Sequence, residues 1–169
     1  MKKILLISDT HNYLDKGLIK HIEAADEIWH AGDIGTIEIC DAIEKLKPLK
    51  AVFGNVDGND IRVAYSENLF FDCENVKVFI THIGGYPGKY PTKIKQLILQ
   101  HKPKLFICGH SHILKVMYDK ELELLHINPG ACGVHGFHTV KTIVKFEIEG
   151  AEIKNLAIIE LGSRTSLTS

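Results

Sequence analysis

Residues 2–33 read KKILLISDTHNYLDKGLIKHIEAADEIWHAGD. Two short apolar runs, residues 3–7 and 27–29, lie near the ends of this stretch, and their length and β-branched content favour buried strands. Between them, residues 14–24 carry apolar side chains at the spacing of a helix. Strand, helix and strand in succession indicate an α/β protein with a layered core.

The same alternation continues through the middle of the chain. Further buried strands are expected at residues 50–53, 76–81 and 104–108, and helices at 36–46 and 92–101. Each strand is short, and each helical segment between them has apolar residues on one side. The first two thirds of the chain therefore predict one α/β sheet with its helices.

The last third of the chain has a different pattern. Consecutive strands are expected at residues 113–118, 122–127, 139–148 and 152–159, with turn residues at 119–121 and 149–150. Strands joined by such short turns form hairpins. We therefore predict a second, largely antiparallel sheet that packs against the first.

Composition indicates one ordinary globular domain. The chain has 169 residues, of which 45% are hydrophobic and 24% are charged. We expect the domain to occupy residues 1–162 and a polar C-terminal tail to follow over 163–169. The net charge of -1 gives no overall basic field, so nucleic acid is not the expected partner.

Cysteine usage and the N-terminus indicate the cellular compartment. The four cysteines are widely spaced, without a CxxC pair, which favours buried free thiols over a zinc clip or a disulfide framework. No apolar stretch approaches the roughly 18 residues that would span a membrane. The first apolar run ends at Ser8 without a cleavage site, so we expect a cytoplasmic protein rather than a secreted one.

Metal-ligand side chains follow five of the expected strands. They are Asp9 and His11, then Asp33, Asn55, His82, and finally His110 and His112. Ligand sites of open α/β sheets lie beyond the carboxyl ends of the strands, where distant parts of the chain meet. Members of a pair two residues apart on an extended backbone also point the same way. Alone, Asp33 or Asn55 would more often cap a turn, but five such strand ends together predict a metal site.

The chemistry of this set favours transition metals. It offers carboxylates, an amide oxygen and imidazoles without a thiolate, which suits Mn²⁺, Fe²⁺, Zn²⁺, Ni²⁺ or Co²⁺ better than Ca²⁺ or an iron–sulfur cluster. Seven ligand-type residues exceed the needs of one tetrahedral ion and fit two. Two ions that share a carboxylate can activate a bridging water and neutralise phosphoryl oxygens.

The order of these residues resembles a known family. The blocks are Asp9-Thr10-His11, Gly32-Asp33, Gly54-Asn55, His82 and Gly109-His110-Ser111-His112. They are similar to the five-block signature of the calcineurin-like metallophosphoesterases, and their spacing resembles the small single-domain phosphodiesterases. The similarity spans nearly the whole chain, including Asn128-Pro129-Gly130. It implies a four-layer αββα sandwich of two mixed sheets flanked by helices.

The resemblance also implies residue roles. Asp9, His11 and His112 would hold one metal ion, and Asn55, His82 and His110 would hold the other, while Asp33 would bridge them. Hydroxide held between the ions would attack phosphorus in line, which makes Asp33, Asn55 and His110 the expected catalytic residues. The implied reaction is hydrolysis of a small phosphate ester, a diester above all. Mn²⁺ is the ion expected to support it in vitro.

One position departs from the family pattern. Many relatives have a histidine directly after the block-three asparagine, where it can assist the leaving group, whereas this chain has Val56. Valine cannot donate a proton, so general-acid help worth about 10²–10⁴-fold would be missing. We expect the enzyme to favour esters whose leaving group departs unprotonated. Asp57 then reads as a residue that orients the loop rather than a catalyst.

Three further histidines are candidates for supporting roles. His30 precedes the Gly32-Asp33 block and either supports a ligand or packs in the core. His135 and His138 follow the Asn128-Pro129-Gly130 turn, where the resemblance places a loop near the cleft, and could contact the substrate phosphate.

Two rival functions remain open at this point. A nuclease would use the same phosphorus chemistry, but the near-neutral charge argues against it. A protein-binding scaffold on the same fold is the second rival, because the resemblance includes a retromer subunit with a degenerate site. This chain retains every metal position, which favours an enzyme. A homo-oligomer is compatible with the sequence, and neither the oligomeric state nor the physiological substrate follows from it.

Overall fold

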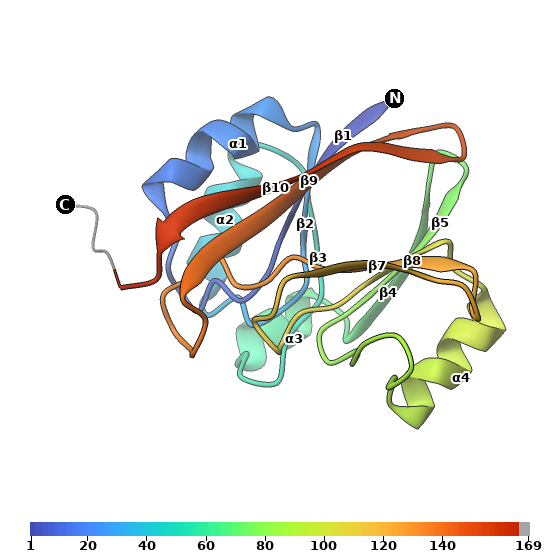
Figure 1. Ribbon diagram of the computed structural model, residues 1–169. Coiled ribbons are helices and arrows are strands. Elements are labelled where there is room, and N and C mark those ends of the chain that lie inside the picture. The colour runs from blue at the N-terminus through green and yellow to red at the C-terminus, as the bar shows by residue number, and fades with distance from the viewer. Residues whose placement is uncertain (166–169) are drawn as a thin grey trace.

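Two five-stranded mixed sheets form the protein, which we describe from a computed structural model covering residues 1–165 (Figure 1). The first sheet has the order β10-β9-β1-β2-β3. Its strands are β1 (Lys2–Ile7), β2 (Glu27–His30), β3 (Leu49–Ala51), β9 (Val140–Glu149) and β10 (Glu152–Ser163). Strands β1, β2 and β3 are parallel, whereas β9 and β10 run antiparallel to their neighbours.

The second sheet has the order β4-β5-β6-β8-β7. Its strands are β4 (Asn68–Cys73), β5 (Val76–Thr81), β6 (Leu105–Ile107), β7 (Lys115–Asp119) and β8 (Leu124–Asn128). Parallel pairing joins β5, β6 and β8, and the two edge strands are antiparallel. The helices are α1 (Ile19–Ala24) with a preceding 3₁₀ turn (Lys16–Leu18), α2 (Ile37–Glu44), α3 (Asn59–Ala64) and α4 (Thr92–His101).

Three apolar layers hold the sheets and helices together. Alternate residues of β1 point to opposite faces, so Ile4 and Leu6 join the core between the sheets while Leu5 and Ile7 join the outer core. That outer core packs α1, α2 and α3 on the first sheet. A third cluster packs α4 on the outer face of the second sheet. The predicted four-layer αββα sandwich is confirmed.

The predicted grouping of the C-terminal strands is wrong. They do not form a separate antiparallel sheet: β7 and β8 join the second sheet, and β9 and β10 join the first. The reason is the free edge of β1, whose backbone groups need a partner and pair with β9, Leu6 lying opposite Val144. A hairpin turn can be recognised from local sequence, but the sheet edge with which the hairpin then pairs cannot.

Most predicted elements are found, with shifts at their ends. Helix α4 has the predicted limits, and the expected helix over residues 14–24 consists of the 3₁₀ turn followed by α1. Sequence reasoning missed α3 and β4. Helix α3 buries only Ile61 completely, and β4 is an edge strand that carries a weak apolar pattern.

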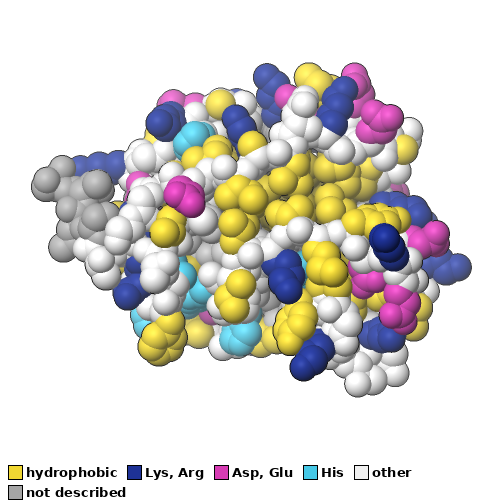
Figure 2. All heavy atoms as spheres, viewed as in Figure 1, with side chains coloured by type: hydrophobic (Ala, Val, Ile, Leu, Met, Phe, Trp, Pro, Cys, Tyr) yellow, Lys and Arg dark blue, Asp and Glu magenta, His cyan; other side chains and the backbone are white. Residues whose placement is uncertain are grey.

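The end of the chain takes part in the fold. We expected a polar tail from residue 163, whereas β10 includes Ser163 and the Arg164 side chain hydrogen bonds to the loop over residues 134–138. Residues 166–169 of that tail lie outside the described part. Figure 2 shows hydrophobic side chains between the β9–β10 hairpin and β7, along one edge of the sandwich. No helix within the described part is long and apolar enough to cross a membrane.

Candidate metal centre

The seven predicted ligands lie in loops that leave the strand ends. Asp9 and His11 follow β1, Asp33 follows β2, and His82 follows β5. Asn55 follows β3, after the single bridge residue Val52. His110 and His112 follow β6. Parallel strands bring their carboxyl ends to one edge of a sheet, and stacking the two sheets brings these edges together.

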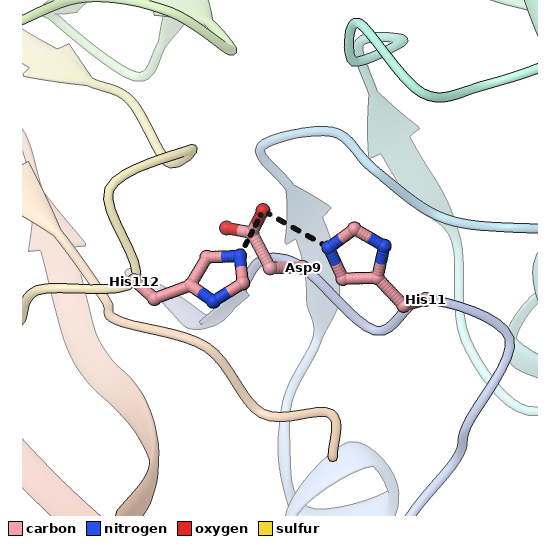
Figure 3. A group of neighbouring side chains, drawn as sticks. All are labelled: Asp9, His11 and His112. Atoms are coloured by element: carbon pink, nitrogen blue, oxygen red, sulfur yellow. Dashed lines mark ion pairs between the residues drawn. The ribbon is translucent and has the colours of Figure 1, made fainter. Parts of the chain in front are cut away.

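Six of these residues form two clusters. Asp9, His11 and His112 make one cluster, and Asp33, His82 and His110 make the other. Within each cluster one potential ligand atom from every residue lies within 4.8 Å of the others. Figure 3 shows the first cluster, with both imidazoles directed at the Asp9 carboxylate. The first cluster has the membership that the family resemblance implied, and the second pairs His82 with His110 as implied but contains Asp33 in place of Asn55.

The backbone reasoning behind the paired histidines is wrong. His110 and His112 belong to different clusters, and their φ angles of 70° and 60° are left-handed rather than extended. Asp9 and His11, with φ of 55° and 43°, are left-handed as well. Such conformations cost about 1–3 kcal/mol each for residues with side chains and gather at functional sites. The backbone between His110 and His112 is therefore not extended, and the two side chains reach different clusters.

The Asp9 carboxylate is held by one oxygen and presents the other. Its Oδ2 accepts hydrogen bonds from Ser8 Oγ at 2.7 Å and from the His110 N–H at 3.2 Å. Its Oδ1 lies 3.2 Å from His112 Nε2 and 3.7 Å from His11 Nε2 (Figure 3). Burial would raise the Asp9 pKa, but the His11 and His112 imidazoles outweigh it and hold that pKa well below its usual range. Asp9 is therefore an anion directed at the cluster.

Asp33 faces both clusters with a single oxygen. Its Oδ1 accepts the Val56 N–H at 3.0 Å. Its Oδ2 lies 3.2 Å from His82 Nε2 and 3.6 Å from His11 Nε2, which belong to different clusters. Gly54 is required for this arrangement, since a Cβ there would lie 2.1 Å from Asp33 Oδ1. The geometry suits a carboxylate that two cations share.

His82 has its proton position fixed by the backbone. Its Nδ1 donates to the Ala31 carbonyl at 2.7 Å, so Nε2 is the nitrogen that faces Asp33. Burial lowers the His82 pKa, but the Asp33 and Asp9 carboxylates raise it by more. The Asp9 carboxylate likewise raises the His11 pKa. Each imidazole therefore faces a site that attracts positive charge.

Unpaired buried atoms test whether metal ions fit these residues. Asp9 Oδ1, His11 Nε2 and His82 Nε2 are buried and have no hydrogen-bond partner among residues 1–165. Buried polar atoms are rarely left unpaired, because each costs about 1–3 kcal/mol. These atoms come from both clusters and point into the space between them. A nitrogen and oxygen ligand set of this kind fits divalent transition ions.

Asn55 completes the predicted set at the solvent side. It is exposed and lines the same cavity as Asp33 and His110. The cavity has a volume of about 480 Å³. Its described lining is His11, Asp33, Asn55, Val56, His110, Ser111, His112, Ile113, His135, Gly136, Phe137 and His138. Asp9 and His82 do not line the cavity, but they lie 3.7 Å from His11 and 3.2 Å from Asp33, which do, so all seven predicted ligands gather at one place.

His30 connects the first two ligand loops and is not a ligand. Its Nδ1 accepts the Gly32 N–H at 3.1 Å, so Nε2 carries the proton and donates to Thr10 Oγ1 at 2.9 Å. Thr10 Oγ1 in turn donates to the Ile34 carbonyl. Complete burial lowers the His30 pKa to about 4, which keeps the ring neutral. Of its two expected roles, the hydrogen bonds favour support of the ligand loops.

Asp57 and Arg62 fix the loop that carries Asn55. The Asp57 carboxylate accepts the N–H groups of Gly54, Gly35 and Ile34 at 2.8, 2.9 and 3.2 Å. Arg62 donates to the backbone carbonyls of residues 54, 55 and 57. Sequence reasoning missed Arg62, because a guanidinium that binds carbonyl groups leaves no local pattern.

The loop over residues 133–138 brings two further histidines beside the clusters. The His135 ring centroid lies 4.8 Å from that of His11, and the His138 ring centroid lies 5.1 Å from that of His112. His138 Nε2 donates to the Gly133 carbonyl, so it braces its own loop. Asn128 supports the His110 segment by donating to the Gly109 carbonyl and to Ser111 Oγ. His135 and His138 both line the cavity, as the resemblance implied.

The fold and the ligand set together define a metalloprotein of the αββα sandwich class. The chain belongs to the calcineurin-like phosphoesterase superfamily, whose domain matches residues 1–151. It is therefore a metal-dependent phosphoesterase.

Individual relatives agree with this family. A protein of Methanothermobacter thermautotrophicus named "Probable metallophosphoesterase" is 26% identical over 164 residues, covering 94% of this chain and 92% of that protein. The structure of an archaeal phosphodiesterase is 26% identical with a TM-score of 0.72, over 94% of this chain and 99% of that one. Vps29 of Entamoeba histolytica, solved with zinc, shares the fold at 15% identity and a TM-score of 0.73, over 96% and 99% of the chains.

Proposed function

We propose that the protein is a phosphodiesterase that works with two divalent transition-metal ions. The observation that carries the proposal is Asp33 Oδ2, which lies within 3.6 Å of histidine nitrogens from both clusters. The similarity to an archaeal phosphodiesterase over 94% of this chain supports a diester substrate.

The chain supplies two sets of ligands around that carboxylate. Asp9, His11 and His112 would hold one ion, His82, His110 and Asn55 the other, and Asp33 would lie between them. Bound divalent ions would supply positive charge to the phosphoryl oxygens and would lower the pKa of a bound water. The protein residues position these ligands through Ser8, His30 and Asp57, which hydrogen bond to them or to their loops.

The charge of the cavity favours a diester over a monoester. Its described lining contains no Lys or Arg, so the protein itself offers no cation to a phosphate beyond the metal site. A diester carries one negative charge, whereas a monoester carries nearly two at neutral pH. The diester also has a second substituent, for which a cavity of about 480 Å³ leaves room.

Val56 determines which leaving groups the enzyme handles. The side chain is 67% exposed and lines the cavity, but it has no proton to give. We expect kcat/KM to fall steeply as the leaving-group pKa rises in a series of aryl diesters. Val56→His is expected to flatten that dependence by accelerating the poorest substrates, within the about 10²–10⁴-fold of general-acid catalysis. A flat dependence in the wild type would contradict the reasoning.

The first experiment is metal reconstitution. The purified protein is stripped of metal and loaded with Mn²⁺, and rates are measured on bis-p-nitrophenyl phosphate and p-nitrophenyl phosphate. We expect Mn²⁺-dependent hydrolysis with the diester preferred. Asp33→Asn should abolish it, whereas the matched control Asp41→Asn, an exposed position on α2, should not.

Other outcomes would select the rival functions. Faster hydrolysis of the monoester would replace the diester assignment. Release of nucleotides from DNA or RNA would indicate a nuclease. Absence of hydrolysis with Mn²⁺, Zn²⁺, Fe²⁺, Ni²⁺ and Co²⁺ alike would favour a protein-binding scaffold on this fold.

A further inference from the structure

Three exposed apolar side chains line the cavity beside the metal centre. Phe137 is 102% exposed, Val56 is 67% exposed and Ile113 is 63% exposed, and all three belong to the lining of the same cavity. Single exposed apolar residues are common on protein surfaces. Three around the cavity that holds the ligand residues are more informative, because apolar surface gathered in a concave site marks a place for a ligand.

Phe137 is held in its exposed position by a braced loop. His138 Nε2 donates to the Gly133 carbonyl at 2.8 Å, and the Gly133 N–H donates to the Asp9 carbonyl at 3.2 Å. Arg164 donates to the carbonyls of His138 and Val134 at 2.7 and 3.3 Å. These hydrogen bonds fix the loop on both sides of Phe137, whose ring is exposed to water.

The glycine before Phe137 places the loop against the metal cluster. Gly136 has a φ of 124°, and a Cβ there would lie 2.2 Å from His112 Nδ1. Phe137 thus directly follows a residue that touches a proposed metal ligand. A substituent on a phosphorus atom bound at the two clusters would occupy the same cavity that Phe137 lines.

The lining also indicates the chemistry of that substituent. Besides the metal-ligand residues, the described lining offers Val56, Ile113 and Phe137 as apolar surface and Ser111, His135 and His138 as polar side chains, and it contains no Lys or Arg. An anionic substituent would find no Lys or Arg there. A flat uncharged ring could pack its face on Phe137, which aromatic pairs favour beyond simple burial.

We propose that Phe137, Val56 and Ile113 form a subsite for an aromatic substituent of the phosphodiester substrate. This inference rests on the proposed function and adds the substrate class. The subsite selects aryl or heteroaryl esters over short alkyl esters by binding the ring, and it takes no part in proton transfer or metal ligation.

Calorimetric binding of two slowly hydrolysed diesters to the Mn²⁺-loaded protein tests the proposal. Dimethyl phosphate reports the metal centre alone, and diphenyl phosphate adds aromatic rings. We expect diphenyl phosphate to bind the wild type about tenfold more tightly. Phe137→Ala should remove most of this preference while leaving the dimethyl phosphate affinity unchanged. Phe137→Leu should retain part of it, since it keeps apolar area but not the ring.

Tyr118→Ala is the matched control, because Tyr118 is an aromatic residue on β7, 55% exposed and outside the cavity lining. It should retain the full preference. Equal affinities of the wild type for the two diesters, or an unchanged preference in Phe137→Ala, would overturn the subsite and leave the proposed function standing. Equal loss of both affinities in Phe137→Ala would also overturn it, since the residue would then support the metal centre. Absence of binding by either diester would overturn both proposals.

Discussion

Asp57→Asn is expected to lower the free energy of unfolding and the metal affinity of the protein while leaving kcat at saturating metal largely intact. The carboxylate joins two ligand loops, because Oδ2 accepts the N–H groups of Gly54 and Ile34, and Oδ1 accepts that of Gly35. The first loop carries Asn55 and the second follows Asp33. An asparagine has the same shape, but one of its two terminal atoms donates instead of accepting.

The magnitude follows from the number of bonds that the amide can keep. With its oxygen in the Oδ2 position, the amide retains the bonds from Gly54 and Ile34 at 2.8 and 3.2 Å and loses that from Gly35 at 2.9 Å. A hydrogen bond to a charged group contributes about 1.5–3 kcal/mol. We therefore expect the free energy of unfolding of the metal-free protein to fall by about 2–3 kcal/mol.

Two assays separate the structural role from a catalytic one. Urea denaturation of the metal-free proteins gives the change in the free energy of unfolding. Titration with Mn²⁺ gives the metal affinity, which loss of loop support should reduce about 10–100-fold. At saturating Mn²⁺ the variant should recover most of the wild-type kcat, because its ligands are intact.

A different combination of results would refute this reasoning. Unchanged stability and metal affinity, together with a large loss of kcat at saturating Mn²⁺, would mean that Asp57 acts on the reacting groups. The loop-orienting interpretation of Asp57 would then be wrong.

Three further predictions concern other contacts in the fold. Gly109→Ala places a Cβ 2.1 Å from Ser8 Oγ, which hydrogen bonds to Asp9, and Mn²⁺ titration should show an affinity lowered by about tenfold or more. The control Gly58→Ala has no atom within 4 Å of its Cβ and should keep the wild-type affinity. His30 has a folded-state pKa of about 4 against an ordinary value of 6.5, so below pH 6.5 only the unfolded chain takes up its proton. Urea denaturation should show about 3 kcal/mol of stability lost between pH 6.5 and 4, and His30→Gln should lack this component of the slope. His126 is fully buried and both its ring nitrogens lack partners among residues 1–165, so His126→Leu should raise the free energy of unfolding by about 1–3 kcal/mol; a destabilised variant would show that the nitrogens are satisfied.

Local patterns predicted the elements whose signals are strong. Helix α4 has the predicted limits, because its apolar residues repeat at helical spacing between Pro91 and the left-handed residue Lys102. Helix α3 was missed because it has only six residues and buries little surface. Strand β4 was missed because it lies at the edge of its sheet. Elements that depend on packing for their stability carry weak local signals.

The sequence by itself determined the chemistry of the site. Short apolar runs that end in Asp, Asn or His are local features, and the rule that parallel strands share a carboxyl edge places their ends together. The identity of the ligand side chains, and hence the prediction of divalent transition ions, follows from the residues alone.

Only the tertiary structure decided which strands belong to which sheet and which ligands belong to which cluster. The free edge of β1 drew β9 and β10 away from β7 and β8. Left-handed backbone at His110 and His112 sent neighbouring ligands to different clusters. Arg164 came back from the end of the chain to brace the loop that exposes Phe137. The physical reason is common to all of these: sheet edges, hydrogen-bond acceptors and backbone strain are satisfied by partners far away in the chain, and no local pattern specifies which partner is free.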